Sequence, residues 1–162
     1  MRADMVGGTG NTRHMSDGSK TEWLVVRAGS RHCALPLADV TETMRPQPVA
    51  SLPGLPPAVL GSATIRGRVV PVVHAAALLG ENATPPMRFV TLKIDQRCVA
   101  LAVDDVIGLR RTTMQLEVAM PPLLAGAADH AVQALGIVDR ELLLVLEGSR
   151  LVPPDVWAAL DQ

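Results

Sequence analysis

The sequence predicts an all-β (mainly β) fold of two small barrels, of about five strands each, packed side by side. Short apolar runs of strand character recur at regular spacing, the two halves of the chain resemble each other, and few segments have helical character. The 162 residues suffice for one domain or for two closely packed subdomains. Units of fewer than about 80 residues would be marginal alone, so the two subdomains should share a core.

The repeat is visible when the two halves are aligned. Residues 27–40 match residues 93–106 at basic, alanine, leucine, aspartate and valine positions, and residues 65–73 fall over residues 137–145. Each half, about residues 22–80 and 87–150, then contains one hairpin, an intervening stretch and a second hairpin. The alternative is that any two pairs of hairpins align loosely through composition.

The strands follow from short β-branched and apolar runs bounded by turn residues. They are predicted over residues 22–27, 32–35, about 40–44, 61–65, 69–73, 88–94, 97–103, 106–111, 133–138 and 141–146.

The connections follow from proline, glycine and alanine. Five prolines from Pro46 to Pro57 prevent regular pairing, so a crossing loop is expected, with at most a short helix at residues 57–60. The alanine-rich residues 74–79 are expected to form one or two helical turns that end at Gly80.

Residues 81–86 form the predicted boundary between the halves, and a loop is expected at about residues 119–129. A closing helix is predicted over residues 154–160, with an acidic residue in its first turn. Residues 1–20, rich in glycine, serine, threonine and methionine without periodicity, are expected to be a disordered tail.

Charge and composition exclude several function classes. Fifteen basic residues nearly balance sixteen acidic ones, so there is no basic surplus for nucleic acid or an anionic membrane. With no tyrosine, one phenylalanine and two tryptophans, base-stacking platforms are excluded as well. No apolar run approaches the roughly 20 residues of a membrane span, and the N-terminus lacks the layout of a signal peptide. We expect a cytoplasmic protein with no direct membrane insertion.

Cys33 and Cys98 lie in strands at nearly equivalent places of the two halves, and we expect both to be buried free thiols. No Cys/His spacing supports a disulfide, a zinc site or another metal or cofactor. A thiol-dependent enzyme using Cys33 or Cys98 is a remote alternative. His32 adjoins Cys33, but neighbouring residues of a strand point to opposite faces, so His74 or His130 would have to supply the imidazole. We therefore predict no catalysis.

The conspicuous charged motif is the turn Arg66-Gly67-Arg68 between two β-type runs. Gly67 allows a positive φ in a tight turn, and Arg66 offers a planar fork of donors suited to binding a partner. In the alignment of the halves Arg66-Gly67 faces Val138-Asp139, so Arg66 belongs to one half alone. A feature added to one copy of a scaffold is more plausibly functional than architectural. The alternative is a surface hairpin whose arginines are merely solvated.

From Trp23 to about Leu160 the chain resembles the CheW-like domain family, the scaffold of bacterial chemotaxis coupling proteins and of the regulatory domain of CheA histidine kinases. The resemblance rests on motifs in matching order, namely ALPL at 34–37 running into VTE at 40–42, LPG at 52–54, LG at 60–61, IRGRVVPVV at 65–73, ALAVDDV at 100–106 and QALGIV at 133–138. It places a CheW-like domain over residues 21–162.

This resemblance implies two intertwined SH3-like barrels around a shared core, without catalysis or cofactors. It also implies partners, namely a chemoreceptor signalling tip and the regulatory domain of a CheA-type histidine kinase. Arg66 and Glu42 match family residues implicated in receptor coupling, and Gly61 matches a glycine that allows a close backbone approach. Gly67 completes the predicted partner-binding set. The alternative for each is a solvated charge or a turn glycine.

The chain departs from the family pattern after the second hairpin strand. Residues 74–77 read HAAA and lack the family's usual aspartate and arginine, and Thr64-Ile65 replaces the usual asparagine-leucine pair. Coupling of a chemoreceptor to the kinase in standard chemotaxis is therefore one of two expectations. The alternative is a CheW-like adaptor of a non-flagellar chemosensory pathway, for pili, surface sensing or second-messenger output.

Overall fold

The computed structural model describes residues 21–82, 84–112, 115–117, 132–138, 141–146 and 151–160. Within these ranges the protein is built mainly of strands, with two short α-helices and one 3-10 turn. The strands are β1 (Thr21–Ala28), β2 (Arg31–Pro36), β3 (Val40–Met44), β4 (Val59–Ile65), β5 (Arg68–His74), β6 (Arg88–Ile94), β7 (Arg97–Val103), β8 (Asp105–Thr112), β9 (Gln115–Glu117), β10 (Val132–Val138) and β11 (Glu141–Leu146). The helical segments are Leu37–Asp39, α2 (Ala75–Leu78) and α3 (Pro154–Leu160).

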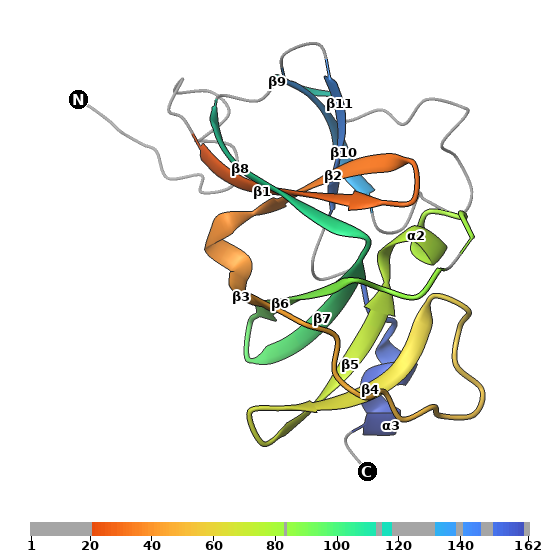
Figure 1. The fold of residues 1–162 in the computed structure, drawn as a ribbon. Helices are drawn as coiled ribbons and strands as arrows, with labels where there is room; N and C mark the ends of the chain where they lie inside the picture. The colour runs from red at the N-terminus through yellow and green to blue at the C-terminus, as the bar shows by residue number, and fades with distance from the viewer. Residues whose placement is uncertain are drawn as a thin grey trace.

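The described strands form two sheets, one above the other in Figure 1. The upper sheet has the order β8-β1-β2-β11-β10-β9, and the lower sheet has the order β3-β6-β7-β5-β4. The prediction of a mainly β fold is confirmed. The lower sheet has the expected five strands, whereas the short edge strand β9, which was not predicted, brings the described upper sheet to six.

The two sheets do not coincide with the two halves of the sequence. The upper sheet joins the β1–β2 hairpin of the first half to the β10–β11 hairpin of the second through a parallel pairing of β2 with β11. The lower sheet joins the β6–β7 and β4–β5 hairpins through a parallel pairing of β7 with β5. If β9 is set aside, the two sheets have equivalent strand orders. Each strand of the first half (β1, β2, β3, β4, β5) takes in one sheet the place that its counterpart in the second half (β6, β7, β8, β10, β11, respectively) takes in the other. The sequence repeat therefore has a counterpart in two sheets that exchange hairpins.

A shared core lies between the sheets. Alternate residues of β1, such as Leu24 and Val26, pack into the same cluster as Val90 of β6 and Leu101 of β7. The intervening residues of the upper sheet, Trp23 among them, form a second cluster. Those of the lower sheet pack around Phe89. The central strands are thus buried on both faces, which explains their nearly continuous apolar sequences.

The segment between the halves is tied to the turn between β1 and β2. The Glu81 carboxylate accepts hydrogen bonds from the backbone N–H and the hydroxyl of Ser30 and lies 3.4 Å from Arg31. The carboxylate of Asp104 accepts from the Gly29 N–H and from the Thr84 hydroxyl. These contacts fix the path of the chain from one half to the next.

The predicted short helix at residues 57–60 is wrong. Pro57 and Ala58 form a turn and β4 already begins at Val59. The Ala58 carbonyl accepts a hydrogen bond from the His74 N–H at 2.7 Å, so this segment is drawn into pairing beside β5. The predicted tail over residues 1–20 and the predicted loop over residues 119–129 lie outside the described residues.

Candidate functional site

The β4–β5 hairpin turns through two residues, Arg66 and Gly67, which both have positive φ angles of 51° and 76°. Two successive residues in this region make a type I′ turn, whose twist suits a two-residue hairpin. Gly67 thus has the positive φ that the sequence predicts. Asparagine, aspartate or glycine would fit the first position better than arginine, so the arginine at position 66 is not explained by turn geometry.

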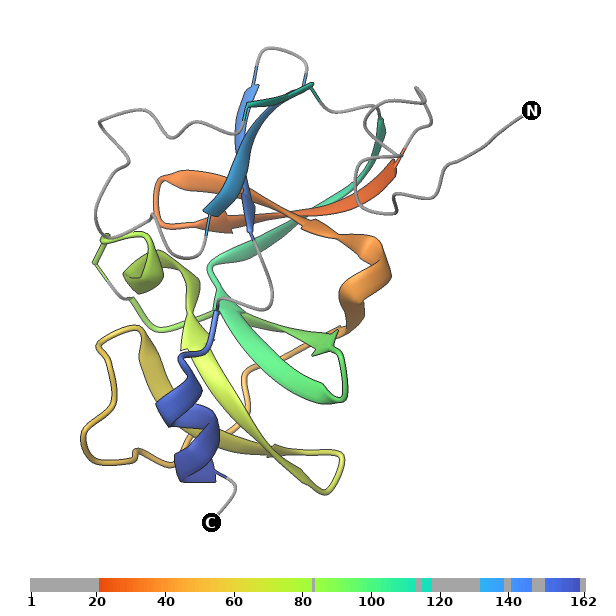
Figure 2. The ribbon, with the colours of Figure 1, turned by 180° about the vertical axis from the view of Figure 1, so that it is seen from behind.

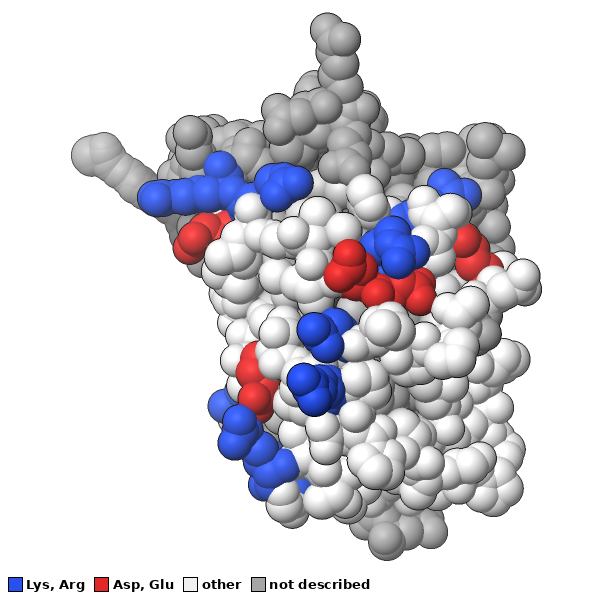
Figure 3. Space-filling view, in the orientation of Figure 1, with Lys and Arg blue, Asp and Glu red and all other residues white. Residues whose placement is uncertain are grey.

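Arg66 forms a bidentate ion pair with Glu42 of β3. Its Nε donates to Oε2 at 2.7 Å and its Nη2 donates to Oε1 at 2.8 Å. The Arg66 side chain is 76% exposed and the Glu42 side chain 26%. Figure 3 shows basic and acidic atoms together over the tip of this hairpin. The pair therefore joins the turn to the edge strand β3 while it stays open to solvent.

Each partner shifts the pKa of the other. The hydrogen bonds from Arg66 hold the pKa of the Glu42 carboxyl below its usual value, and Glu42 raises the pKa of the Arg66 guanidinium. Both groups are therefore charged at neutral pH. The pair is a charge-assisted fork of fixed geometry.

The backbone of β3 aims Glu42 at this position. The pairing of β3 with β6 shifts register between Val40 and Glu42, and the Thr91 hydroxyl donates to the Glu42 carbonyl at 3.2 Å. A register shift of this kind re-aims side chains at a sheet edge. Sequence reasoning selected Glu42 and Arg66 separately and did not predict that they bind each other.

Gly61 lies in β4, away from the hairpin tip, where its backbone closely approaches another segment of the chain. It has a φ of 143°, and a Cβ added there would lie 2.0 Å from the Ala50 carbonyl oxygen. The close approach is that of the proline-rich crossing loop, where Ala50 and Ser62 exchange two backbone hydrogen bonds. The structure thus brings Arg66, Gly67 and Glu42 together and places Gly61 at an internal contact.

These features are accompanied by a match to the CheW-like domain family over residues 22–154. The chain belongs to the CheW-like domain family. A solved structure, the scaffolding protein TtCheW from Thermoanaerobacter tengcongensis, is similar with a TM-score of 0.67 at 17% sequence identity, covering 79% of this chain and 89% of that one. The SH3-like β fold of that structure agrees with the two sheets described above.

Three relatives extend the comparison. The probable chemotaxis protein CheW of Rhizobium etli is 24% identical over 129 residues, which cover 78% of this chain and 83% of that protein. The chemotaxis protein CheW of Rhizobium meliloti is 32% identical over 101 residues, covering 60% and 64%. Protein PilI of Pseudomonas aeruginosa is 27% identical over 111 residues, covering 62% of each. Family membership and these relatives indicate a non-catalytic scaffold or adaptor.

The departure from the CheW-like pattern at His74 has a structural role. His74 ends β5 and is 2% exposed. Its Nδ1 accepts the Ala77 N–H at the start of α2, and its Nε2 lies 2.6 Å from the Thr84 carbonyl oxygen. A neutral imidazole protonated on Nε2 satisfies both contacts. His74 therefore caps the predicted helical turn, which α2 and the positive φ of Gly80 confirm.

The two cysteines of this CheW-like domain differ. Cys33 is buried as predicted, and burial raises the pKa of its thiol to about 12, so it stays protonated at neutral pH and is not a nucleophile. The prediction that Cys98 is equally buried is wrong, because Cys98 is only partly buried. The sequence alignment places it opposite His32 rather than Cys33, and an offset of one residue in a strand puts the side chain on the other face.

Among the described residues, no helix has both the length and the apolar character needed to cross a membrane. No cluster of three or more histidine, cysteine, aspartate or glutamate side chains suited to a metal ion occurs among them.

Proposed function

We propose that this chain couples the signalling tip of a methyl-accepting chemoreceptor to the regulatory domain of a CheA-type histidine kinase in two-component signal transduction. It acts as a non-catalytic cytoplasmic adaptor that joins membrane receptor arrays through its partners. The receptor binds at the tip of the β4–β5 hairpin and the adjacent part of β3, through Arg66, Glu42 and Gly67. Gly61 supports this face through the internal contact of its backbone.

The observation that carries this proposal is the exposed, bidentate Arg66–Glu42 pair. A guanidinium has five N–H donors, so the two hydrogen bonds to Glu42 leave three further donors on a side chain that is largely exposed. The pair also fixes the orientation of the fork before a partner arrives, which lowers the entropy cost of binding. Carbonyl or carboxylate oxygens on a helical receptor tip are the acceptors that such a fork recognises.

The test compares two partners by calorimetric titration. We expect Arg66→Ala to lower receptor-tip affinity by about 10- to 100-fold, the loss typical of a charge-assisted contact in an interface. Arg66→Lys should rescue it poorly, because a point charge does not reproduce a planar fork. We infer from the family resemblance that the kinase binds at other edges of the sheets, so kinase affinity should persist.

Arg111→Ala is the matched control, since Arg111 is an exposed arginine on β8 of the other sheet. It should leave receptor affinity within about twofold, as expected for a residue outside the interface. Equal loss of both partners in the Arg66→Ala protein, or loss of neither, would contradict the assignment of Arg66 to the receptor face.

The second candidate is a CheW-like adaptor of a non-flagellar chemosensory pathway. Similarity to protein PilI and the HAAA run at residues 74–77 support it. The two candidates are separated by titrating this chain against the receptor tips and kinases of each chemosensory system of its own organism. Preference for a system that drives flagellar motors supports the first candidate, and preference for any other supports the second.

A further inference from the structure

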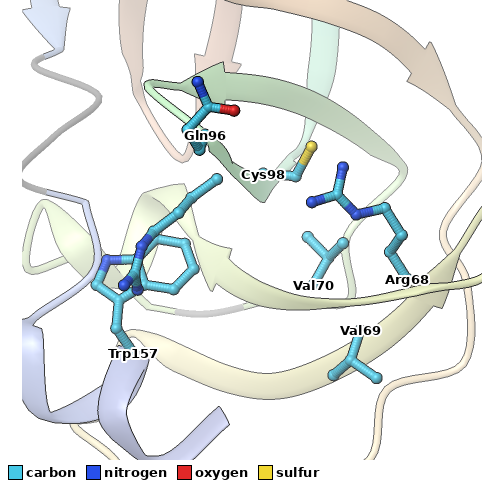
Figure 4. A pocket seen from close by; sticks show the side chains of 7 residues that line it. Arg68, Val69, Val70, Gln96, Cys98 and Trp157 are labelled. Atoms are coloured by element: carbon cyan, nitrogen blue, oxygen red, sulfur yellow. The ribbon is translucent and has the colours of Figure 1, made fainter. Parts of the chain in front are cut away.

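A partly open cavity of about 300 Å³ lies behind the hairpin, between the start of β5, the turn from β6 to β7, and α3. Figure 4 shows its lining side chains, and Figure 2 shows α3 from the rear of the molecule, in front of the lower sheet. The lining residues are Arg68, Val69, Val70, Gln96, Arg97, Cys98 and Trp157. We call this cavity the Arg68 pocket.

The described lining of the Arg68 pocket has positive charge and no carboxylate. Arg68 and Arg97 supply two guanidinium groups, and Gln96 supplies an amide. The Arg97 guanidinium lies over the Trp157 ring, 4.7 Å from its centroid, and this cation–π contact fixes its orientation. The wall of the pocket therefore contains two guanidinium groups, and that of Arg97 has a fixed orientation.

Arg68 differs from its neighbour Arg66 in its surroundings. Arg66 is neutralised by Glu42, whereas Arg68 forms no ion pair within the described part of the chain. Figure 4 shows the Arg68 guanidinium directed across the pocket toward Cys98, away from Val69. The two arginines of one turn thus face different surfaces, and the receptor face uses only one of them.

We propose that the Arg68 pocket binds a small organic dianion, a molecule with two carboxylate or phosphate groups on an apolar or aromatic body. Guanidinium forks pair with both kinds of acid group, and Val70 and the Trp157 ring offer apolar surface to the body of the ligand. The volume lies at the lower end of the range for small-molecule sites. This site is separate from the Arg66–Glu42 pair, and its occupancy does not depend on the proposed receptor contact.

Cys98 lines the same pocket and reports on it. With dithiobis(nitrobenzoate), an aromatic disulfide that carries two carboxylates, the Cys98 thiolate attacks one sulfur, forms a mixed disulfide and releases one thionitrobenzoate. Dithiodipyridine undergoes the same exchange without charge. Cys33 contributes no signal in the folded protein, because it is buried and its thiol has a pKa of about 12.

We expect the rate with dithiobis(nitrobenzoate) to saturate with concentration in the full chain. Arg68→Gln should lower that rate about tenfold at low reagent concentration and change the rate with dithiodipyridine by less than about twofold. Arg88→Gln, at an exposed arginine of β6 outside the pocket, is the matched control and should leave both rates unchanged. Isophthalate and resorcinol bisphosphate carry two carboxylates and two phosphates on an aromatic ring, and protection by one of them against the charged reagent identifies which acid group is preferred.

Several outcomes would overturn the proposal. The first is a reaction rate that depends strictly linearly on the concentration of dithiobis(nitrobenzoate), and the second is an equal slowing of both reagents by Arg68→Gln. The third is that Arg88→Gln slows the charged reagent as much as Arg68→Gln does. The fourth is that neither anion protects Cys98. An unfolded Arg68→Gln protein is recognised separately, because Cys33 would then react with both reagents.

Discussion

Replacement of Gly61 by alanine tests whether this glycine acts through the fold. The added Cβ would lie 2.0 Å from the Ala50 carbonyl oxygen, where ordinary contact is 3.4–4 Å, so the crossing loop must move. That movement breaks the hydrogen bonds of 2.7 and 2.9 Å between Ala50 and Ser62, which contribute about 1 kcal/mol each. The φ of 143° adds about 1–2 kcal/mol of backbone strain for a residue with a side chain. We expect Gly61→Ala to lower the free energy of unfolding by about 3–4 kcal/mol, the sum of the two lost hydrogen bonds and the strain.

Gly54→Ala is the matched control. Gly54 also has a positive φ, of 76°, but nothing lies within 4 Å of its Cβ position, so only strain of about 1 kcal/mol is expected. Urea denaturation measures both values. If Gly61→Ala costs no more than Gly54→Ala, the internal close approach is not what requires glycine at position 61.

Three other predictions concern the ion pair, the exchanged sheets and the buried thiol. Arg66→Ala should raise the pKa of Glu42, measured by NMR titration. Since this pKa is depressed in the folded protein, the pair's stabilisation is complete above the unfolded pKa and is lost as pH falls through the folded pKa. The wild type should therefore lose more stability than Arg66→Ala across this acid range, and parallel pH curves would contradict the assignment. A fragment of residues 20–82 should be unfolded or aggregated, because its strands lose their partners β6, β7, β8 and β11, and a well-dispersed amide NMR spectrum would refute this. Cys33→Ala should cost about 1 kcal/mol in urea denaturation and leave partner binding unchanged.

The positions of the strands were predictable because they depend on local pattern. Strands over 40–44, 88–94, 97–103 and 141–146 have the predicted bounds, since turn residues flank short apolar runs. The closing helix over 154–160 is confirmed in the same way. Period and turn chemistry are local properties, and they identify the faces of a strand without identifying its neighbour.

The pairing of strands was not predictable from local pattern alone. The parallel contacts of β2 with β11 and of β5 with β7 join hairpins from opposite halves, and no turn residue encodes them. The helix expected at residues 57–60 failed for a related reason, because hydrogen bonding to His74 overrides the local preference.

The candidate site shows the same division. The residue types at 42 and 66 were identified from the turn and the family resemblance, but they lie 24 positions apart and meet only through the register of β3. The positive φ of Arg66 has no sequence signal, since arginine is uncommon there. The Arg68 pocket was missed because α3 brings Trp157 to Arg97 from the far end of the chain.

The exchange of hairpins has a consequence for an adaptor. Any tilt of one sheet against the other would expose the cluster that Leu24, Val90 and Leu101 share, and exposing each such side chain costs roughly 1.5–3 kcal/mol. The central strands of each sheet are therefore fixed by the other sheet as well as by their own neighbours. Under the proposed function, a receptor bound at the hairpin tip and a kinase bound on another edge would be held in one constant relative orientation. Coupling in such a molecule depends on the fixed relative position of its two binding surfaces and not on movement about a hinge. It should therefore be most sensitive to substitutions that shift the β4–β5 hairpin relative to β3 without unfolding the core.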